Sequence, residues 1–309
     1  PEAPGSGRNW DYRYCWLRDA TFTLYALLSS GYTEEAAAWR EWLLRAIAGD
    51  HEKLQIVYGL AGERRLTELE LPWLPGYAGN SPVRIGNAAY AQRQLDVYGE
   101  VMDALYVARR HQIEFEDDSW EVQRKLMDVL ESRWDKPDRG LWEMRGGDRH
   151  FTHSKMMAWV AFDRAIKTME RFEIEGPLQR WRQTRDRIHA EVCDKGFSRK
   201  RGAFVQSYEA EDLDAALLLM PLVGFLPAKD PRVRGTVEAI MRDLTADGLV
   251  MRYRTNKSVD GLPPGEGLFL ACSFWLVDNL TLLGRYDEAE ALFARLLGLR
   301  NDVGLLAEE

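Results

Sequence analysis

Two ten-residue stretches near opposite ends of this 309-residue chain resemble each other, and this internal repeat constrains the fold more than any other feature. Leu27–Ala36 and Leu282–Ala291 both begin with a leucine pair, turn at a glycine and continue through a tyrosine into an acidic segment that contains alanine. A looser third copy lies at Pro221–Phe225, ahead of Pro231. Each copy predicts the end of one helix, a glycine turn and the start of a second helix. Repeated helical hairpins form either an open solenoid or a closed ring.

Apolar residues at helical spacing extend this prediction to most of the chain. The helices at 210–225 and 266–283 are apolar, whereas those at 33–47 and 287–299 are amphipathic. This alternation favours an all-α barrel with a buried inner ring and an outer ring of helices, whose loops form a pocket at one end. The complete set of predicted helices is 16–30, 33–47, 87–111 (capped by Asn87), 117–134, 153–173, 176–193, 210–225, 231–245, 266–283 and 287–299, with short strands at 204–207 and 249–253.

The stretch from Gly49 to Gly86 has no helical pattern and is rich in glycine and proline. It also contains Trp73 and Tyr77. A loop of this length inside a compact domain is usually functional or disordered, and its aromatic residues favour a function.

The composition excludes several classes of function. A net charge of −8 argues against nucleic-acid binding, and no apolar run is long enough to span a bilayer. The three cysteines are odd in number and far apart, which predicts a reducing, cytoplasmic compartment. His150 and His153 have no third ligand at helical spacing, and no nucleotide-binding motif occurs. We therefore expect neither a metal nor another cofactor.

The stretch from Arg139 to Trp159 contains the main candidate for chemistry. Glu143 directly follows Trp142, and a Gly146-Gly147 turn leads towards a helix start. A carboxyl group beside an indole is partly desolvated, which raises its pKa and keeps it able to donate a proton. The alternative is a surface glutamate in a loop, with Trp142 as a core anchor.

Other candidates lie where helices begin or end. Arg18 and Asp19, at a helix start, suit a clamp on two neighbouring hydroxyl groups, or form an ordinary ion pair. Arg252 precedes a glycine-rich turn and is either a binding residue or a solvated charge on a strand end. The final acids Glu308 and Glu309 are either functional or part of a solvated tail.

Several short segments carry a family resemblance when they are read together. They are Asn9–Ala20, Leu71–Tyr77, Val83–Asn87, Leu141–Glu143, Gly265–Gly267 with Cys272–Trp275, and Leu305–Glu309. The ordered set spans nearly the whole chain and resembles the glucoamylase-type glycoside hydrolases of family 15, in their bacterial trehalase and glucoamylase branch. The resemblance implies an (α/α)6 barrel, with residues 1–309 as the catalytic domain, and the activity of an inverting, exo-acting α-glucosidase.

The resemblance also assigns roles to residues. Glu143 is the expected general acid and Glu308 the expected general base, with Glu309 as the alternative base. An inverting hydrolase needs its two carboxyl groups ~6.5–9.5 Å apart, which leaves room for a water molecule. The residues expected to contact the sugar are Trp16, Arg18, Asp19, Trp73, Trp142, Lys155, Arg252 and Glu266.

The sequence departs from the family pattern at both ends. It has no counterpart of the N-terminal β-sandwich domain that bacterial members commonly carry, and it stops where the family continues into another helix. We therefore expect a fragment of a longer protein whose barrel lacks its last helix. The expected substrate is a small carbohydrate: trehalose is favoured over short α-glucans, and isomaltose-type glucosides or a non-catalytic sugar-binding module are the alternatives. A phosphorylase is disfavoured, because Arg300 is the only basic residue near Glu308. Neither nucleic acid nor membrane is an expected partner, and homo-oligomerisation is left open.

Overall fold

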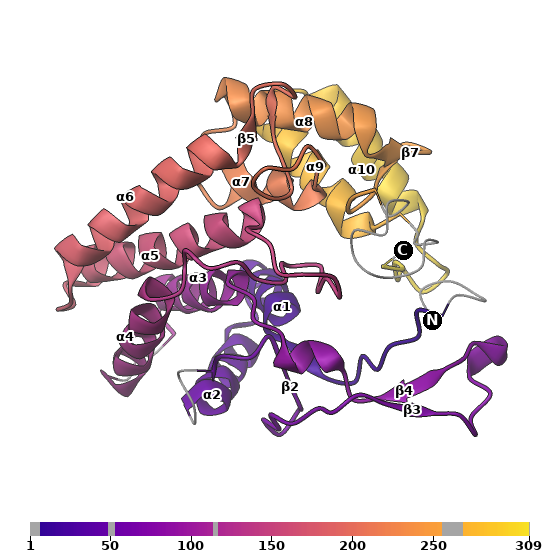
Figure 1. Cartoon of the computed structure of the whole chain (residues 1–309), viewed down its shortest axis with the longest axis horizontal. Helices are drawn as coiled ribbons and strands as arrows, with labels where there is room; N and C mark the ends of the chain where they lie inside the picture. Colours follow the sequence, from indigo (N-terminus) through magenta and orange to yellow (C-terminus); the bar gives the residue numbers. More distant parts are fainter. Residues whose placement is uncertain (1–6, 49–52, 114–116, 255–267, 309) are drawn as a thin grey trace.

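The structure is a computed structural model that describes residues 7–48, 53–113, 117–254 and 268–308. Helices dominate it and pair into hairpins that curve around a common centre (Figure 1). The inner elements are α1 (Leu17–Ser29), α3 (Asp96–Arg110), α5 (Thr152–Phe172), the 3-10 turn η4 (Ala215–Leu218) leading into α7 (Leu219–Leu222), and α9 (Leu270–Leu282). The outer helices are α2 (Thr33–Ala48), α4 (Asp117–Glu131), α6 (Leu178–Lys195), α8 (Pro231–Asp243) and α10 (Tyr286–Gly298). The predicted all-α barrel of helical hairpins is confirmed.

Burial separates the inner helices α3 and α5 from the outer helices. Successive inner helices pack on one another, α1 on α3 and α3 on α5. Every residue of α5 from Thr152 to Ile166 is buried, so this part of the helix has no polar face left for solvent. The outer helix α6 buries only one stripe, which includes Trp181 and Ile188. The first and last inner helices also meet, because the rings of Phe22 in α1 and Trp275 in α9 lie 6.2 Å apart.

Four two-stranded antiparallel sheets lie at the ends of the helices; the strands of three of them are consecutive in the chain, whereas α1 and α2 lie between the strands of the fourth. Among the described residues no sheet has more than two strands. The strands predicted at 204–207 and 249–253 are present only in part. The pairs are β1 (Cys15–Trp16) with β2 (Val57–Tyr58), β3 (Leu69–Leu71) with β4 (Val83–Ile85), β5 (Phe197–Ser198) with β6 (Ala203–Phe204), and β7 (Thr245–Ala246) with β8 (Leu249–Val250).

The long helix predicted to begin at Asn87 is wrong in its first part. Asn87 caps only the 3-10 turn η3 (Ala88–Ala91), and α3 begins at Asp96. Just before α3, the amide of Leu95 donates a hydrogen bond of 2.8 Å to the buried carboxylate of Asp138. A tertiary contact of this kind outweighs the local helix propensity of the intervening residues.

The helix predicted at 210–225 is also shorter than expected. Asp212 lies outside any helix, and its carbonyl accepts a hydrogen bond of 2.7 Å from the amide of Gln206. Helical structure begins after Asp214, whose carboxylate caps η4 by accepting from the amide of Ala216 at 2.8 Å. The apolar character of this stretch therefore reflects its burial in the inner layer rather than one long helix. No described helix is long and apolar enough to cross a membrane.

Candidate active site

A cavity of about 930 Å³ lies where the inner helices α1 and α9 begin, and it extends down between them. Both predicted catalytic acids, Glu143 and Glu308, line this cavity. These acids come from distant parts of the chain, and the fold brings them to one place. The predicted sugar contacts that also line the cavity are Trp16, Arg18, Asp19, Trp142 and Arg252.

Glu143 sits in a tight turn. Its amide donates to the carbonyl of Gly140 at 3.1 Å, and a backbone bridge between Asp138 and Arg149 closes the base of the loop. The φ angle of Glu143 is +57°, in the left-handed region that residues with a Cβ seldom adopt. Unfavourable backbone geometry that the surrounding structure maintains is typical of functional sites.

The carboxyl group of Glu143 contacts an indole, but not the one predicted. Trp16 donates a hydrogen bond from Nε1 to Glu143 Oε1 at 2.7 Å, and Arg18 Nη2 lies 3.8 Å from the same oxygen. Burial raises the pKa of Glu143, and the nearby charge of Arg18 and the Trp16 bond offset this only in part. The carboxyl group therefore stays protonated to a higher pH than an ordinary glutamate does.

Arg18 connects the first helix to the turn that carries Glu143. It donates a hydrogen bond of 2.8 Å from Nη1 to the carbonyl of Leu141, two residues before Glu143. Its Nη2 lies 3.2 Å from the carboxylate of Asp19, whose side chain is 60% exposed towards the cavity opening. One guanidinium thus positions the turn, while the neighbouring carboxylate keeps free lone pairs for hydroxyl groups of a ligand.

Trp142 forms an aromatic wall of the cavity. Its Nε1 donates to Asp214 Oδ1 at 2.9 Å, and its ring centroid lies 5.5 Å from that of Phe269. The guanidinium carbon of Arg252 lies 5.3 Å from the Trp142 ring and 5.0 Å from the Phe269 ring. Burial raises the pKa of Asp214. No sequence pattern singled out Asp214, which holds this wall from behind.

Glu308 lies in the segment 301–308, every residue of which is exposed. Its backbone carbonyl accepts a hydrogen bond of 2.9 Å from the amide of Leu270, the first residue of α9. This bond brings the segment to the mouth of the cavity. Glu309 and Glu266, the other two acids singled out by the sequence, lie outside the described residues.

Two residues expected to contact the sugar lie elsewhere. Lys155 is fully buried, and its Nζ donates to the backbone carbonyls of Trp134 and Lys136. The first turn of α5 packs against these carbonyls, so the lysine satisfies them instead of facing the cavity. Trp73 follows β3 on the long hairpin with β4; it is 72% exposed and does not line the cavity. The structure does not support a place for either residue in the site.

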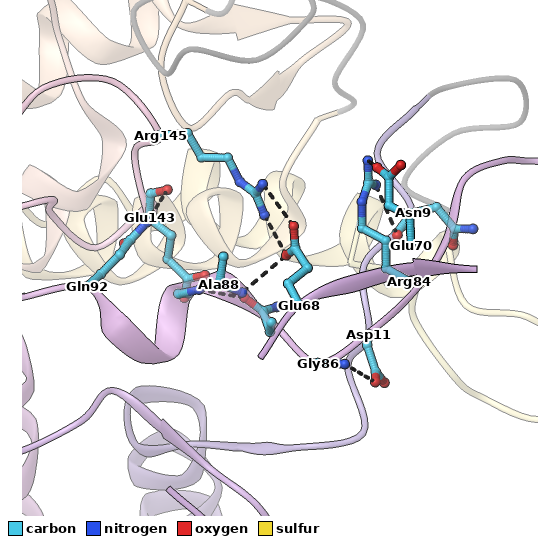
Figure 2. Close-up of polar contacts among 12 residues, drawn as sticks. Asn9, Asp11, Glu68, Glu70, Arg84, Gly86, Ala88, Gln92, Glu143 and Arg145 are labelled. Carbon is cyan, nitrogen blue, oxygen red and sulfur yellow. Dashed lines mark hydrogen bonds and ion pairs between the residues drawn. The ribbon is translucent and has the colours of Figure 1, made fainter. Parts of the chain in front are cut away.

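Trp10, Gln92 and Arg145 are among the cavity-lining residues that the sequence did not single out. Gln92 donates from Nε2 to the carbonyl of Glu143 at 3.2 Å (Figure 2). Trp10 and Arg145 lie within sequence stretches that contain other candidate residues, whereas no sequence motif includes Gln92. Within the described ranges, no three His, Cys, Asp or Glu side chains are grouped closely enough to hold a metal ion.

The fold and the cavity place the chain among barrels of helical hairpins with an acid-lined site at one end. The chain belongs to the glycosyl hydrolases family 15, because the sequence model of that family matches residues 1–300. It is 44% identical to a trehalase of Mycobacterium tuberculosis and 36% identical to a trehalase of Thermoplasma acidophilum. Both alignments cover the whole chain but only 46% and 52% of the relatives, so the chain spans about half of their length.

Solved structures with a similar fold agree with this family. A wild-type glycosidase superposes with a TM-score of 0.75 at 19% identity, over 99% of this chain and 80% of its own. A glucoamylase from Saccharomycopsis fibuligera superposes with a TM-score of 0.66 at 15% identity, over 93% of this chain and 68% of its own. At these identities the likeness demonstrates the shared fold.

Proposed function

We propose that this chain carries the active site of an inverting α-glucoside hydrolase that acts on trehalose in preference to short α-glucans. The surroundings of Glu143 carry the proposal: a carboxyl group with a raised pKa faces a cavity that it shares with a second carboxyl group, Glu308. Two relatives of the chain are named trehalases, and a glycosidase variant with the same fold is described in complex with glucose.

In the proposed reaction, Glu143 gives its proton to the glycosidic oxygen. Glu308 removes a proton from a water molecule on the opposite face of the sugar ring. The water oxygen bonds to C1 as the bond between C1 and the leaving sugar breaks, so the released glucose has the β configuration. The distance that this mechanism requires between the two carboxyl groups is about 6.5–9.5 Å.

The remaining residues bind and orient the sugar. Arg18 and Asp19, at the start of α1, supply hydrogen-bond donors and acceptors for neighbouring hydroxyl groups of the nonreducing glucose. Trp16 and Trp142 both line the cavity and offer flat apolar faces to a sugar ring. Arg252, close to the Trp142 ring, donates to the sugar from the side of α9.

The cytoplasmic location expected from the cysteines stays a prediction.

Proton NMR of the sugars released in the first minutes tests the proposal. For trehalose, we expect equal initial amounts of α- and β-glucose, because one glucose is inverted and the other leaves with its original configuration. Glu143→Gln should lower the rate by about 10²–10⁴-fold, the usual contribution of a general acid. Glu288→Gln, which removes an exposed carboxylate of α10 that pairs with Arg285, is the matched control.

Three results would contradict the proposal in different ways. Initial α-glucose alone would exclude inversion. Faster hydrolysis of maltose or isomaltose than of trehalose would show that the preferred substrate is a short α-glucan and not trehalose. Sugar binding without turnover of any of these sugars would indicate a non-catalytic binding module.

A further inference from the structure

Trp10, on the wall of the cavity, contacts two arginine side chains. The guanidinium carbon of Arg145 lies 4.1 Å from the centroid of the Trp10 ring, and that of Arg84 lies 4.6 Å from it. Contacts this close between a guanidinium and an indole are favourable cation–π interactions. Of the two arginines only Arg145 lines the cavity, so the exposed part of this group consists of Trp10 and Arg145.

Carboxylates from the hairpin region hold both arginines in place. Glu68 binds Arg145 through two hydrogen bonds of 3.2 and 2.8 Å, and Glu70 in β3 binds Arg84 at 3.0 Å (Figure 2). Glu68 also accepts a hydrogen bond of 3.1 Å from the amide of Ala88. Burial raises the pKa of Glu68, but these bonds outweigh burial, and the net shift is downward. The Glu68 carboxylate therefore remains charged and the geometry of Arg145 remains fixed.

The segment that carries Trp10 is attached to the same hairpin. Asn9 donates from Nδ2 to the carbonyls of Asn80 and Pro82, both at 3.2 Å, and Arg84 donates to the carbonyl of Gly7 at 3.0 Å. One residue after Trp10, Asp11 accepts from the amide of Gly86 at 3.1 Å. Trp10 is therefore fixed on both sides, and the surface it forms with Arg145 is preorganised.

The order of contacts along the turn indicates which part of a substrate this surface faces. Arg18, assigned to the nonreducing glucose, holds the carbonyl of Leu141, two residues before the acid. Arg145, two residues after the acid, extends from the turn towards Glu68 (Figure 2). Because Glu143 must face the glycosidic oxygen and Arg18 is assigned to the nonreducing glucose, Arg145, which lines the same cavity and is held by Glu68 rather than by α1, is available for the leaving sugar.

We propose that Arg145 and Trp10, held by Glu68, bind the leaving-group sugar and determine which leaving groups the site accepts. The proposal rests on the proposed function, since it needs a glycosidic bond at Glu143. A guanidinium has five N–H donors, so Arg145 retains donors for hydroxyl groups after binding Glu68. The Trp10 indole provides an apolar surface for one face of the same sugar. Lysine cannot reproduce this geometry, because an ammonium lacks the planar fork.

Two substrates with the same transferred glucose and different leaving groups test this proposal. Trehalose releases a sugar, whereas α-glucosyl fluoride releases only fluoride. For Arg145→Lys, and independently for Glu68→Gln, we expect kcat/KM for trehalose to fall by about 10–100-fold, the value of a hydrogen bond to a charged group. Hydrolysis of α-glucosyl fluoride should stay within about twofold of the wild type. Glu288→Gln, which breaks a comparable arginine pair on α10, should change neither rate.

Each other outcome overturns a defined part of this account. Equal losses on both substrates would show that Arg145 acts only by positioning Glu143, and no loss on either would show that it does not contact the leaving group. A wild-type protein that hydrolyses the fluoride but not trehalose would contradict the proposed substrate. A wild-type protein that hydrolyses neither would contradict the proposed function itself, and with it this assignment.

Discussion

Glu143 and Glu308 line one cavity, yet the segments that carry them are held very differently. The Glu143 turn is closed by the backbone bridge between Asp138 and Arg149 and is fixed from outside by Arg18. Segment 301–308 is exposed throughout and is joined to α9 by the bond from Leu270 to the Glu308 carbonyl. Within the segment, the side-chain oxygen of Asn301 accepts hydrogen bonds from two backbone amides.

This difference matches what each carboxyl group is proposed to do. A general acid needs a raised pKa, which requires burial, and burial requires that the surrounding polar groups be satisfied. A general base must be reached by water, which an exposed segment allows. The consequence is that the Glu143 turn should tolerate changes in geometry poorly, whereas the Glu308 segment should adapt to them.

Shortening each acid by one methylene should give the largest effect. We expect Glu143→Asp to lower kcat for trehalose by about a hundredfold, the cost of displacing a catalytic group by about one ångström. Glu308→Asp should lose only about tenfold, because its segment is free to shift towards the sugar. Steady-state kinetics of the two variants give the ratio. An equal loss, or a greater one for Glu308→Asp, would mean that both segments are equally rigid.

Removing a polar anchor from each region should show the same contrast in stability. Asp214→Ala leaves the buried donors of Trp142, Ala216 and Gln206 without their acceptor, and should lower the free energy of unfolding by about 2 kcal/mol. Asn301→Ala affects only exposed amides and should change it by at most about 0.5 kcal/mol. Urea denaturation of both variants measures these values. Similar values would remove the distinction between the two regions.

The smallest expected effect is a change in the pH dependence of activity. Activity requires protonated Glu143 and is therefore lost as the pH rises through its pKa, which burial raises. The Trp16 hydrogen bond favours the ionised carboxylate and so lowers this pKa. Trp16→Phe removes the donor, and the alkaline limb of the profile of kcat/KM against pH should move to higher pH. An alkaline limb that stays in place or moves to lower pH would show that the Trp16 hydrogen bond does not lower the pKa of Glu143.

The sequence predicted the helical hairpins and most of the site because both depend on local signals. The glycine turns and apolar periodicity defined the hairpins, and the Trp-Glu and Arg-Asp pairs marked residues that line the cavity. The sequence did not predict the direction in which each side chain of a turn points. Glu143 and Trp142 are neighbours, yet Trp142 binds Asp214, and the indole that contacts Glu143 comes from Trp16.

Residues whose roles depend on distant partners were beyond prediction. Lys155 is a polar residue at a helix start, but the carbonyls of the preceding loop occupy its amine. Trp73 belongs to a hairpin, and no residue spacing in the sequence predicts how that hairpin is directed relative to the cavity. Asp214 and Gln92 act through tertiary hydrogen bonds to Trp142 and Glu143. Aspartate and glutamine are also common at positions that have no role in a site, so the residue type alone gave no signal.

The left-handed backbone of Glu143 has a consequence for how this protein changes over generations. Glycine adopts such a conformation freely, whereas a residue with a Cβ is strained there. A single nucleotide change converts either glutamate codon into a glycine codon, so the residue that suits the backbone best is always one mutation away. In a lineage released from selection for the carboxyl group, that mutation would relieve the backbone strain and would remove the acceptor of the Trp16 hydrogen bond. The amino acid found at this position in any descendant therefore reports whether the carboxyl group is still in use.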